Sequence, residues 1–219
     1  CVFQKDEFND ICVINIFYPL TMECELANKG IGYFTSKMLF KGTQNLLQGL
    51  EESQSLPKAF IFISTVAVYG EENGINISEN APLLAKDPYG LSKIQAEQLV
   101  LDWCKKYNVI CTILRLPLLA GQNPPGNLGN MIKAIQNGYY FNIAGGKAIK
   151  SMVLAEDIAK VILNVAKIGG TYNLTDGSHP TFKELSQTIG KSRIINLAFN
   201  KYFDHKYNTI FNNVAAGIT

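Results

Sequence analysis

The chain has 219 residues, of which 47% are hydrophobic and 17% charged, a composition typical of a globular protein with a sizeable core. Lys and Arg number 20 and Asp and Glu 18, scattered along the sequence, so we expect no nucleic-acid partner. The most apolar runs are far shorter than the roughly 20 residues that cross a bilayer. No signal peptide is recognisable at the start. We therefore predict a cytoplasmic protein without a membrane partner.

The cysteines and histidines offer no disulfide or metal pattern. No two cysteines form a CxxC pair, and His179 and His205 lie far from them in sequence. Cysteines inside apolar runs behave as small buried hydrophobes, and free thiols suit a reducing compartment. We predict no metal site and no disulfide among Cys1, Cys12, Cys24, Cys104 and Cys111.

Short apolar runs rich in β-branched residues alternate with longer stretches of helical periodicity. This alternation predicts an α/β fold whose parallel sheet is covered on both faces. Thr181 and Glu184 have the spacing of a capping box, which marks one helix start. We predict strands at residues 10–17, 58–64, 109–116 and 171–174, and helices at 34–52, 88–107, 127–137, 155–166 and 181–189.

Residues 118–150 are rich in Gly, Pro and Asn, including QNPPGN from Gln122. Such a composition favours loops on the surface of a sheet. We predict a region of irregular loops around one short helix. The residues after 190 have no clear period, and we predict no element there.

Tyr89 and Lys93 stand four residues apart in PYGLSKIQAEQLV and share one face of a helix. A phenol titrates at about pH 10 unaided, and a nearby ammonium lowers that pKa, which makes tyrosine usable as an acid or base near neutrality. The spacing alone is also compatible with an ordinary solvated helix face.

Two hydroxyl residues, Ser64 and Thr65, end the buried strand AFIFIS. The ends of parallel strands are where open α/β sheets bind ligands. A hydroxyl at this point can donate to a substrate oxygen beside Tyr89. The alternative for Thr65 is a hydroxyl bonded to its own backbone. Arg115, at the end of another predicted strand, is expected to pair with a carboxylate for structural reasons.

Six segments in this order resemble the extended short-chain dehydrogenase/reductase family, particularly its nucleotide-sugar epimerases and reductases. The resemblance runs over about residues 10–190. The segments are KGTQNLL at Lys41, FISTVAVYG at Phe62, PYGLSK at Pro88, LRLPLLAG at Leu114, KSMVLAEDIA at Lys150 and GGTYNLTDG at Gly169.

The resemblance implies a Rossmann-like doubly wound sheet that binds NAD or NADP. It implies that Tyr89 is the catalytic acid and base, that Lys93 lowers its pKa and holds the nicotinamide ribose, and that Thr65 orients the substrate oxygen. The hydride chemistry belongs to the cofactor. Further cofactor-binding residues implied in this way are Pro117, Leu118, Ser64 and Asn15.

The resemblance also implies a small-molecule substrate, a nucleotide-linked or similar sugar. Lys150 matches a basic position near the substrate diphosphate, and His179 lies in a loop expected beside the cleft, although both are equally compatible with solvated surface positions. In this family the equivalents of helices 34–52 and 88–107 pair across a two-fold axis. These helices carry more apolar residues than one sheet face requires, so we predict a homodimer; the residues are Leu46, Leu47, Leu99 and Trp103.

Three departures from the family pattern modify these expectations. Thr35 stands where the third glycine of the pyrophosphate-binding turn belongs, so we expect the first two βα units to be absent. Leu39 and Leu118 replace asparagines of many epimerases, which favours a reductase. Val66 and Ala67 replace the Asp-Glu of the dehydratases, so water elimination is not expected.

We predict that residues 1–117 form an N-terminally incomplete dinucleotide-binding domain. Residues 118–219 are expected to form mainly a substrate-binding region, with 151–175 returning to the sheet. The main competing function is a non-catalytic nucleotide-sensing or scaffold protein with the same fold. Steroid or flavonoid substrates are a further alternative, because Leu118 and Leu119 would tolerate them.

Overall fold

The computed structural model describes residues 11–14, 31–54, 56–70, 74–121, 124 and 126–191, with side chains for all of these except 13–14 and 31–38. The chain divides into two compact units. The first unit is Cys1–Arg115 with Ile162–Asn173, and the second is Leu116–Val161 with Leu174–Thr219.

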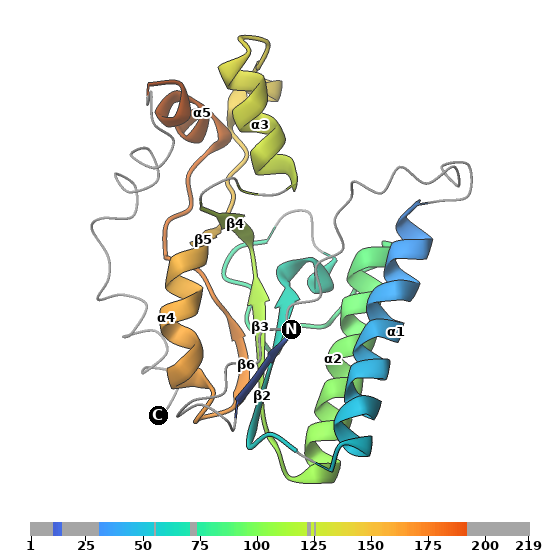
Figure 1. The fold of residues 1–219 in the computed structure, drawn as a ribbon. Coiled ribbons are helices and arrows are strands. Elements are labelled where there is room, and N and C mark those ends of the chain that lie inside the picture. The colour runs from blue at the N-terminus through green and yellow to red at the C-terminus, as the bar shows by residue number, and fades with distance from the viewer. Residues whose placement is uncertain are drawn as a thin grey trace. The chain divides into compact units, whose positions relative to one another are not determined.

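The first unit contains a four-stranded sheet in the order β1-β2-β3-β6 (Figure 1). β1 pairs parallel with β2, and β3 pairs parallel with β6. The α/β class with parallel strands is therefore confirmed. The strands are β1 (Ile11–Ile14), β2 (Ala59–Thr65), β3 (Ile110–Leu116) and β6 (Gly170–Asn173).

Both faces of β2 are buried, as expected for a parallel sheet covered by helices. Phe60 and Phe62 on one face and Ile61 and Ile63 on the other are each at most 6% exposed. On the Phe60 face lie α1 (Ile31–Glu52) and α2 (Pro88–Tyr107), which pack against each other as predicted.

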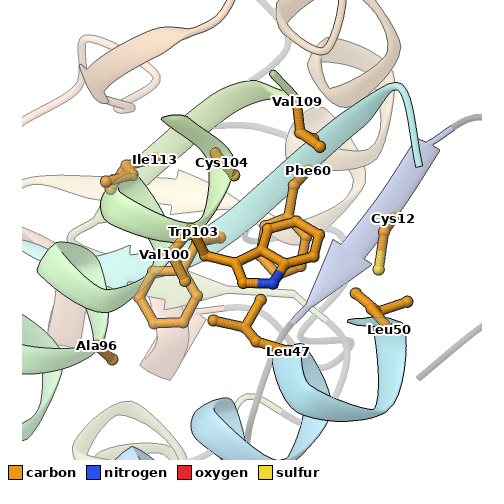
Figure 2. Packing of buried hydrophobic residues seen from close by; sticks show 11 residues of the cluster. Cys12, Leu47, Leu50, Phe60, Ala96, Val100, Trp103, Cys104, Val109 and Ile113 are labelled. Atoms are coloured by element: carbon orange, nitrogen blue, oxygen red, sulfur yellow. The ribbon is translucent and has the colours of Figure 1, made fainter. Parts of the chain in front are cut away.

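The core between these two helices and the sheet surrounds Trp103 (Figure 2). Its ring centroid lies 5.7 Å from that of Phe60 and 5.1 Å from that of Tyr107. Its indole N–H is buried and has no hydrogen-bond partner among the described residues. Leu47 and Trp103 are 3% and 5% exposed, so these two residues, on which the dimer prediction partly rests, are buried within one chain.

The second unit has a parallel pair of short strands, β4 (Leu118–Ala120) and β5 (Met152–Leu154). Against them pack α3 (Gly126–Gln136) and α5 (Phe182–Lys191), through Leu128, Ile132, Leu185 and Ile189. The prediction that 118–150 holds only loops around one helix is wrong. Three residues after Pro117 are too few to show the alternation that identifies a strand.

The remaining helical elements are η2 (Val66–Tyr69) in the first unit, η3 (Ile143–Gly146) in the second, and α4 (Ala155–Val165), whose residues belong to both. The predicted capping box is confirmed, because the Thr181 N–H donates to Glu184 Oε2 at 2.8 Å and the Glu184 N–H donates to Thr181 Oγ1 at 3.1 Å. In the described part of the chain, every helix is too short or too polar to pass through a bilayer.

Candidate active site

β2 ends at Thr65, as the sequence predicts, and the chain turns there into η2. Thr65 Oγ1 accepts a hydrogen bond from the Ala67 N–H at 3.2 Å and so caps this short helix. The alternative prediction, that the Thr65 hydroxyl bonds to nearby backbone, is therefore confirmed. A hydroxyl also donates one hydrogen, so Thr65 keeps a donor for a second partner.

α2 begins close to η2 because the sequence provides a cap and a small residue. Asp87 Oδ1 accepts from the Gly90 N–H at 2.9 Å, and Pro88 occupies the first turn, where its missing N–H costs no hydrogen bond. A Cβ on Gly90 would lie 2.5 Å from Ala85 Cβ and 3.1 Å from the Ala67 oxygen. Gly90 therefore lets the helix start, with Tyr89, approach the end of β2.

Tyr89 and Thr65 are brought together by this approach. Partial burial raises the pKa of Tyr89, the nearby Thr65 hydroxyl lowers it, and the negative charge of Asp87 raises it again. The net change is upward, so the expected lowering by Lys93 is not present in the structure. Tyr89 remains 44% exposed and is accessible to a ligand.

Lys93 is turned toward the strand end, which explains why it does not lower the Tyr89 pKa here. Its ammonium donates to the Ile63 carbonyl oxygen at 2.9 Å and lies 5.0 Å from the centroid of the Phe62 ring. The residue is 4% exposed. Burial lowers the pKa of Lys93 to about 8, although the negative charge of Glu97 acts in the opposite direction.

Ser64, predicted to bind cofactor, uses its hydroxyl inside the protein. The hydroxyl donates to Glu97 Oε1, and both residues are buried. Arg115 Nη2 lies 2.7 Å from Glu97 Oε2, which confirms the prediction that Arg115 pairs with a carboxylate for structural reasons.

This buried pair continues into a wider polar network. Arg115 Nη1 donates to Tyr69 Oη at 2.9 Å, and that hydroxyl donates to Asn173 Oδ1 at 2.7 Å. The Asn173 N–H in turn donates to Glu79 Oε1 at 2.9 Å. Sequence reasoning missed Glu97, although its spacing of four from Lys93 and eight from Tyr89 puts all three on one helix face.

The second unit brings Lys150 and the segment that contains His179 close together. The Lys150 N–H donates to the Pro180 carbonyl oxygen at 3.1 Å, beside a bridge between Ile149 and Thr181. Of the two predicted substrate residues, Lys150 is exposed and His179 lies next to Pro180 in the same loop.

Two other predicted cofactor residues belong to the second unit. Leu118 lies on β4, where it is partly buried against the apolar core of the second unit, and Pro117 immediately precedes it. Asn15 lies outside the described residues.

The family model described as the NAD dependent epimerase/dehydratase family matches residues 31–174. The chain belongs to this family. The predicted resemblance is thereby confirmed, and the match includes Thr65, Tyr89, Lys93 and the Glu97–Arg115 pair.

Curated relatives of this chain include several sugar 4-epimerases. An N-acetyl-alpha-D-glucosaminyl-diphospho-ditrans,octacis-undecaprenol 4-epimerase of Escherichia coli O157:H7 is 33% identical over 158 residues, which is 69% of this chain and 47% of the relative. A UDP-glucose 4-epimerase of Azospirillum brasilense is 39% identical over 69 residues, 32% of this chain and 20% of the relative. The chain thus spans about half the length of the first of these and less of the second.

Solved structures share the fold. RMD from Pseudomonas aeruginosa complexed with NADPH has a TM-score of 0.65 at 22% identity, over 83% of this chain and 63% of that one. The UDP-glucose 4-epimerase of Thermus thermophilus, in complex with NAD, has a TM-score of 0.59 at 23% identity, over 68% and 52%. These likenesses confirm the Rossmann-like α/β architecture.

Proposed function

We propose that the protein is an NAD(P)-dependent epimerase of a diphosphate-linked sugar, with Thr65, Tyr89 and Lys93 as its acid–base site. The Thr65 hydroxyl stands at the end of a parallel strand, near enough to Tyr89 to lower the Tyr89 pKa, and this is the observation that carries the proposal. With two neighbouring hydroxyls, one can orient a sugar hydroxyl while the other accepts its proton. The 4-epimerases among the relatives favour an epimerase over the reductase that Leu39 and Leu118 suggest.

In this mechanism the Thr65 hydroxyl turns from Tyr89 to the reacting sugar oxygen, donates its one hydrogen to it and holds it beside Tyr89. Tyr89 takes the proton of the sugar hydroxyl as the carbon is oxidised to a ketone. It returns the proton when the ketone is reduced from the opposite face, so the configuration inverts and Tyr89 ends in its starting state. The dinucleotide, when bound, would accept the hydride and later donate it back. In its oxidised form it would also bring a positively charged nicotinamide ring.

The raised pKa of Tyr89 has a consequence for this cycle. Without ligands the phenol is protonated at neutral pH, which suits the acid step but leaves too little phenolate to act as the base. Additional positive charge is needed for proton removal. We propose that the oxidised nicotinamide ring, when bound, would add this charge beside the phenol, and that Lys93, held against the strand end, would fix the ribose that carries the ring.

The residues around Lys93 fit a dinucleotide ribose. An ammonium has three N–H donors, and the structure gives one of them to Ile63. The others can serve ribose hydroxyls, which is the role proposed for Lys93. The Ser64 hydroxyl is used by Glu97, so any contribution of Ser64 to the cofactor would come from its backbone. Pro117, Leu118 and Asn15 remain proposed cofactor residues, and Lys150 and His179 proposed substrate residues.

The test is incubation of the protein with NAD and a panel of UDP-linked and prenyl-diphosphate-linked hexoses, followed by separation of the sugar epimers. We expect one epimer pair to equilibrate without net change in NADH absorbance, because each hydride taken from the sugar is returned to it. Net consumption of NADPH with a keto-sugar would instead show a reductase. Dinucleotide binding without turnover of any sugar would support the scaffold alternative.

We also propose that α1 and α2 form the interface of a homodimer. Two apolar side chains of α2, Leu91 and Leu101, are 43% and 40% exposed and are available for such contacts. Light scattering at micromolar concentration tests this: a dimeric mass is expected, and a monomeric mass would contradict the proposal.

A further inference from the structure

Two adjacent polar contacts attach α2 to the end of β2. Lys93 donates to the Ile63 carbonyl oxygen, and Ser64 donates to Glu97. Residues 63 and 64 are consecutive in the strand, and residues 93 and 97 are one helical turn apart. The side chains of Ser64, Lys93 and Glu97 are buried, at 4%, 4% and 2% exposure. The contacts therefore fix the position of α2 along its own axis relative to the end of β2.

The Glu97 carboxylate is held in this position by Arg115. Arg115 Nε lies 3.1 Å from Oε1 and 3.3 Å from Oε2 of Glu97, and Nη2 lies 2.7 Å from Oε2. A buried ion pair of this kind rarely stabilises a fold more than apolar residues of similar volume would. Glu97 lies one helical turn after Lys93 and two after Tyr89 on α2. This location points to a role in positioning these two residues rather than in stability.

The same arginine reaches the segment that follows Thr65. Arg115 Nη1 donates to Tyr69 Oη at 2.9 Å and to the Glu79 carbonyl oxygen at 2.9 Å. Tyr69 ends η2, and Thr65 caps its beginning. One side chain on β3 therefore secures both the helix that carries Tyr89 and the short helix whose cap is Thr65.

We propose that Glu97 and Arg115 are positioning residues, which set the separation of Tyr89 from Thr65 and hold the Lys93 side chain against the strand end. The proposal rests on the proposed function for its effect on turnover. Glu97 and Arg115 are 2% and 5% exposed, so neither is expected to touch substrate.

Glu97 also has an electrostatic effect on Lys93. Among the described residues, Glu97 is the charge that acts on the Lys93 pKa, in the upward direction. Without it, the pKa of Lys93 would fall further below about 8 and the ammonium would be lost at a lower pH. The groups that the structure places around the Lys93 ammonium are Glu97 on its own helix, Phe62 and Ile63 on β2, and Arg115 behind Glu97.

The test compares Glu97→Gln, Ser64→Ala and the neutral double variant Glu97→Leu/Arg115→Met with a control, Asp102→Asn. The control removes an exposed carboxylate from the same helix and is expected to behave as the parent. The double variant removes both buried charges together, which protects it from the cost of a lone buried ion. Folding of each variant is checked by thermal unfolding.

Two measurements are made on each folded variant. The first is the pH profile of kcat and KM, and the second is the titration of the Lys93 ammonium by side-chain NMR without ligands, assigned with Lys93→Met. For Glu97→Gln we expect kcat to fall by roughly 10²-fold, the scale of a small misplacement of reacting groups. We also expect the alkaline limb of the profile and the NMR midpoint to move to lower pH.

Ser64→Ala and the double variant are expected to lose kcat with little change in KM. Full turnover in the folded double variant would overturn the proposal, and so would a Glu97→Gln variant whose NMR midpoint and pH profile are unmoved. A parent protein without sugar turnover would contradict the proposed function only. In that case the NMR titration still decides whether Glu97 controls Lys93, and an unmoved midpoint overturns the inference.

Discussion

The Lys93 ammonium lies 2.9 Å from the Ile63 carbonyl oxygen, so a positive charge is buried at the end of a parallel strand. Its pKa falls from 10.5 to about 8 in the folded protein. Between these two values the unfolded chain binds more protons than the folded one, so folding stability rises with pH across that window. Below about pH 8 both states are protonated and the full cost of burying the charge is present.

We therefore expect Lys93→Met to be more stable than the parent at pH 7, and its advantage to shrink as pH rises from about 8 to about 10.5. The measurement is the free energy of unfolding in denaturant at several pH values. Lys105→Met, which removes an exposed lysine of the same helix, controls for general alkaline effects. A constant difference between Lys93→Met and the parent would contradict the buried ammonium.

The pKa of Tyr89 should respond in opposite directions to two nearly isosteric changes. Thr65→Val removes the hydroxyl that lowers this pKa and should raise it further, whereas Asp87→Asn removes a negative charge that raises it and should lower it. Phenolate absorbance during an alkaline titration, with Tyr89→Phe as the baseline, gives the Tyr89 value. Shifts of the same sign in both variants would refute this account of the site.

Gly90 and Gly49 provide a matched pair of glycines in helices. Gly49 has open space around it, so Gly49→Ala should stabilise the protein by about 1 kcal/mol. At Gly90 a methyl group would collide with Ala85 and Ala67, and Gly90→Ala should destabilise by about 2 kcal/mol. Thermal unfolding distinguishes the two. Equal effects would mean that α2 does not begin in close contact with η2.

Tyr89→Phe keeps the ring but removes the oxygen proposed to transfer the proton. We expect the fold to be unchanged and turnover to fall by about 10²-fold or more, the usual contribution of a positioned acid–base group. Epimer formation under saturating sugar measures it. Turnover within a few-fold of the parent would remove Tyr89 from the mechanism.

The sequence predicts the elements of the first unit well, because buried parallel strands and long helices leave strong periodic signals. The predicted bounds of β2 and β3 lie within one residue of the observed ones, and the Thr65 position follows from the end of β2. The sequence does not reveal β4, because three residues carry no period. The resemblance identifies Tyr89 and Lys93 as partners, but not the direction in which Lys93 points.

That direction depends on contacts between residues remote in sequence. The Lys93 side chain could follow the helix surface toward Tyr89 or turn to the strand, and the Ile63 carbonyl oxygen favours the second. The sequence predicts that Arg115 pairs with a carboxylate but does not identify the residue. Which one depends on the register of α2 against β3, and local patterns do not encode that register.

Trp103 is the chain's single tryptophan, and it lies in the apolar core between α1, α2 and the sheet. Its indole N–H, without a partner among the described residues, is shielded from water. Emission from such an indole lies at short wavelength and moves to the red when water enters. The intrinsic tryptophan fluorescence of this chain therefore has one source. It reports separation of the helix that carries Tyr89 from its neighbours, with no label and no substrate.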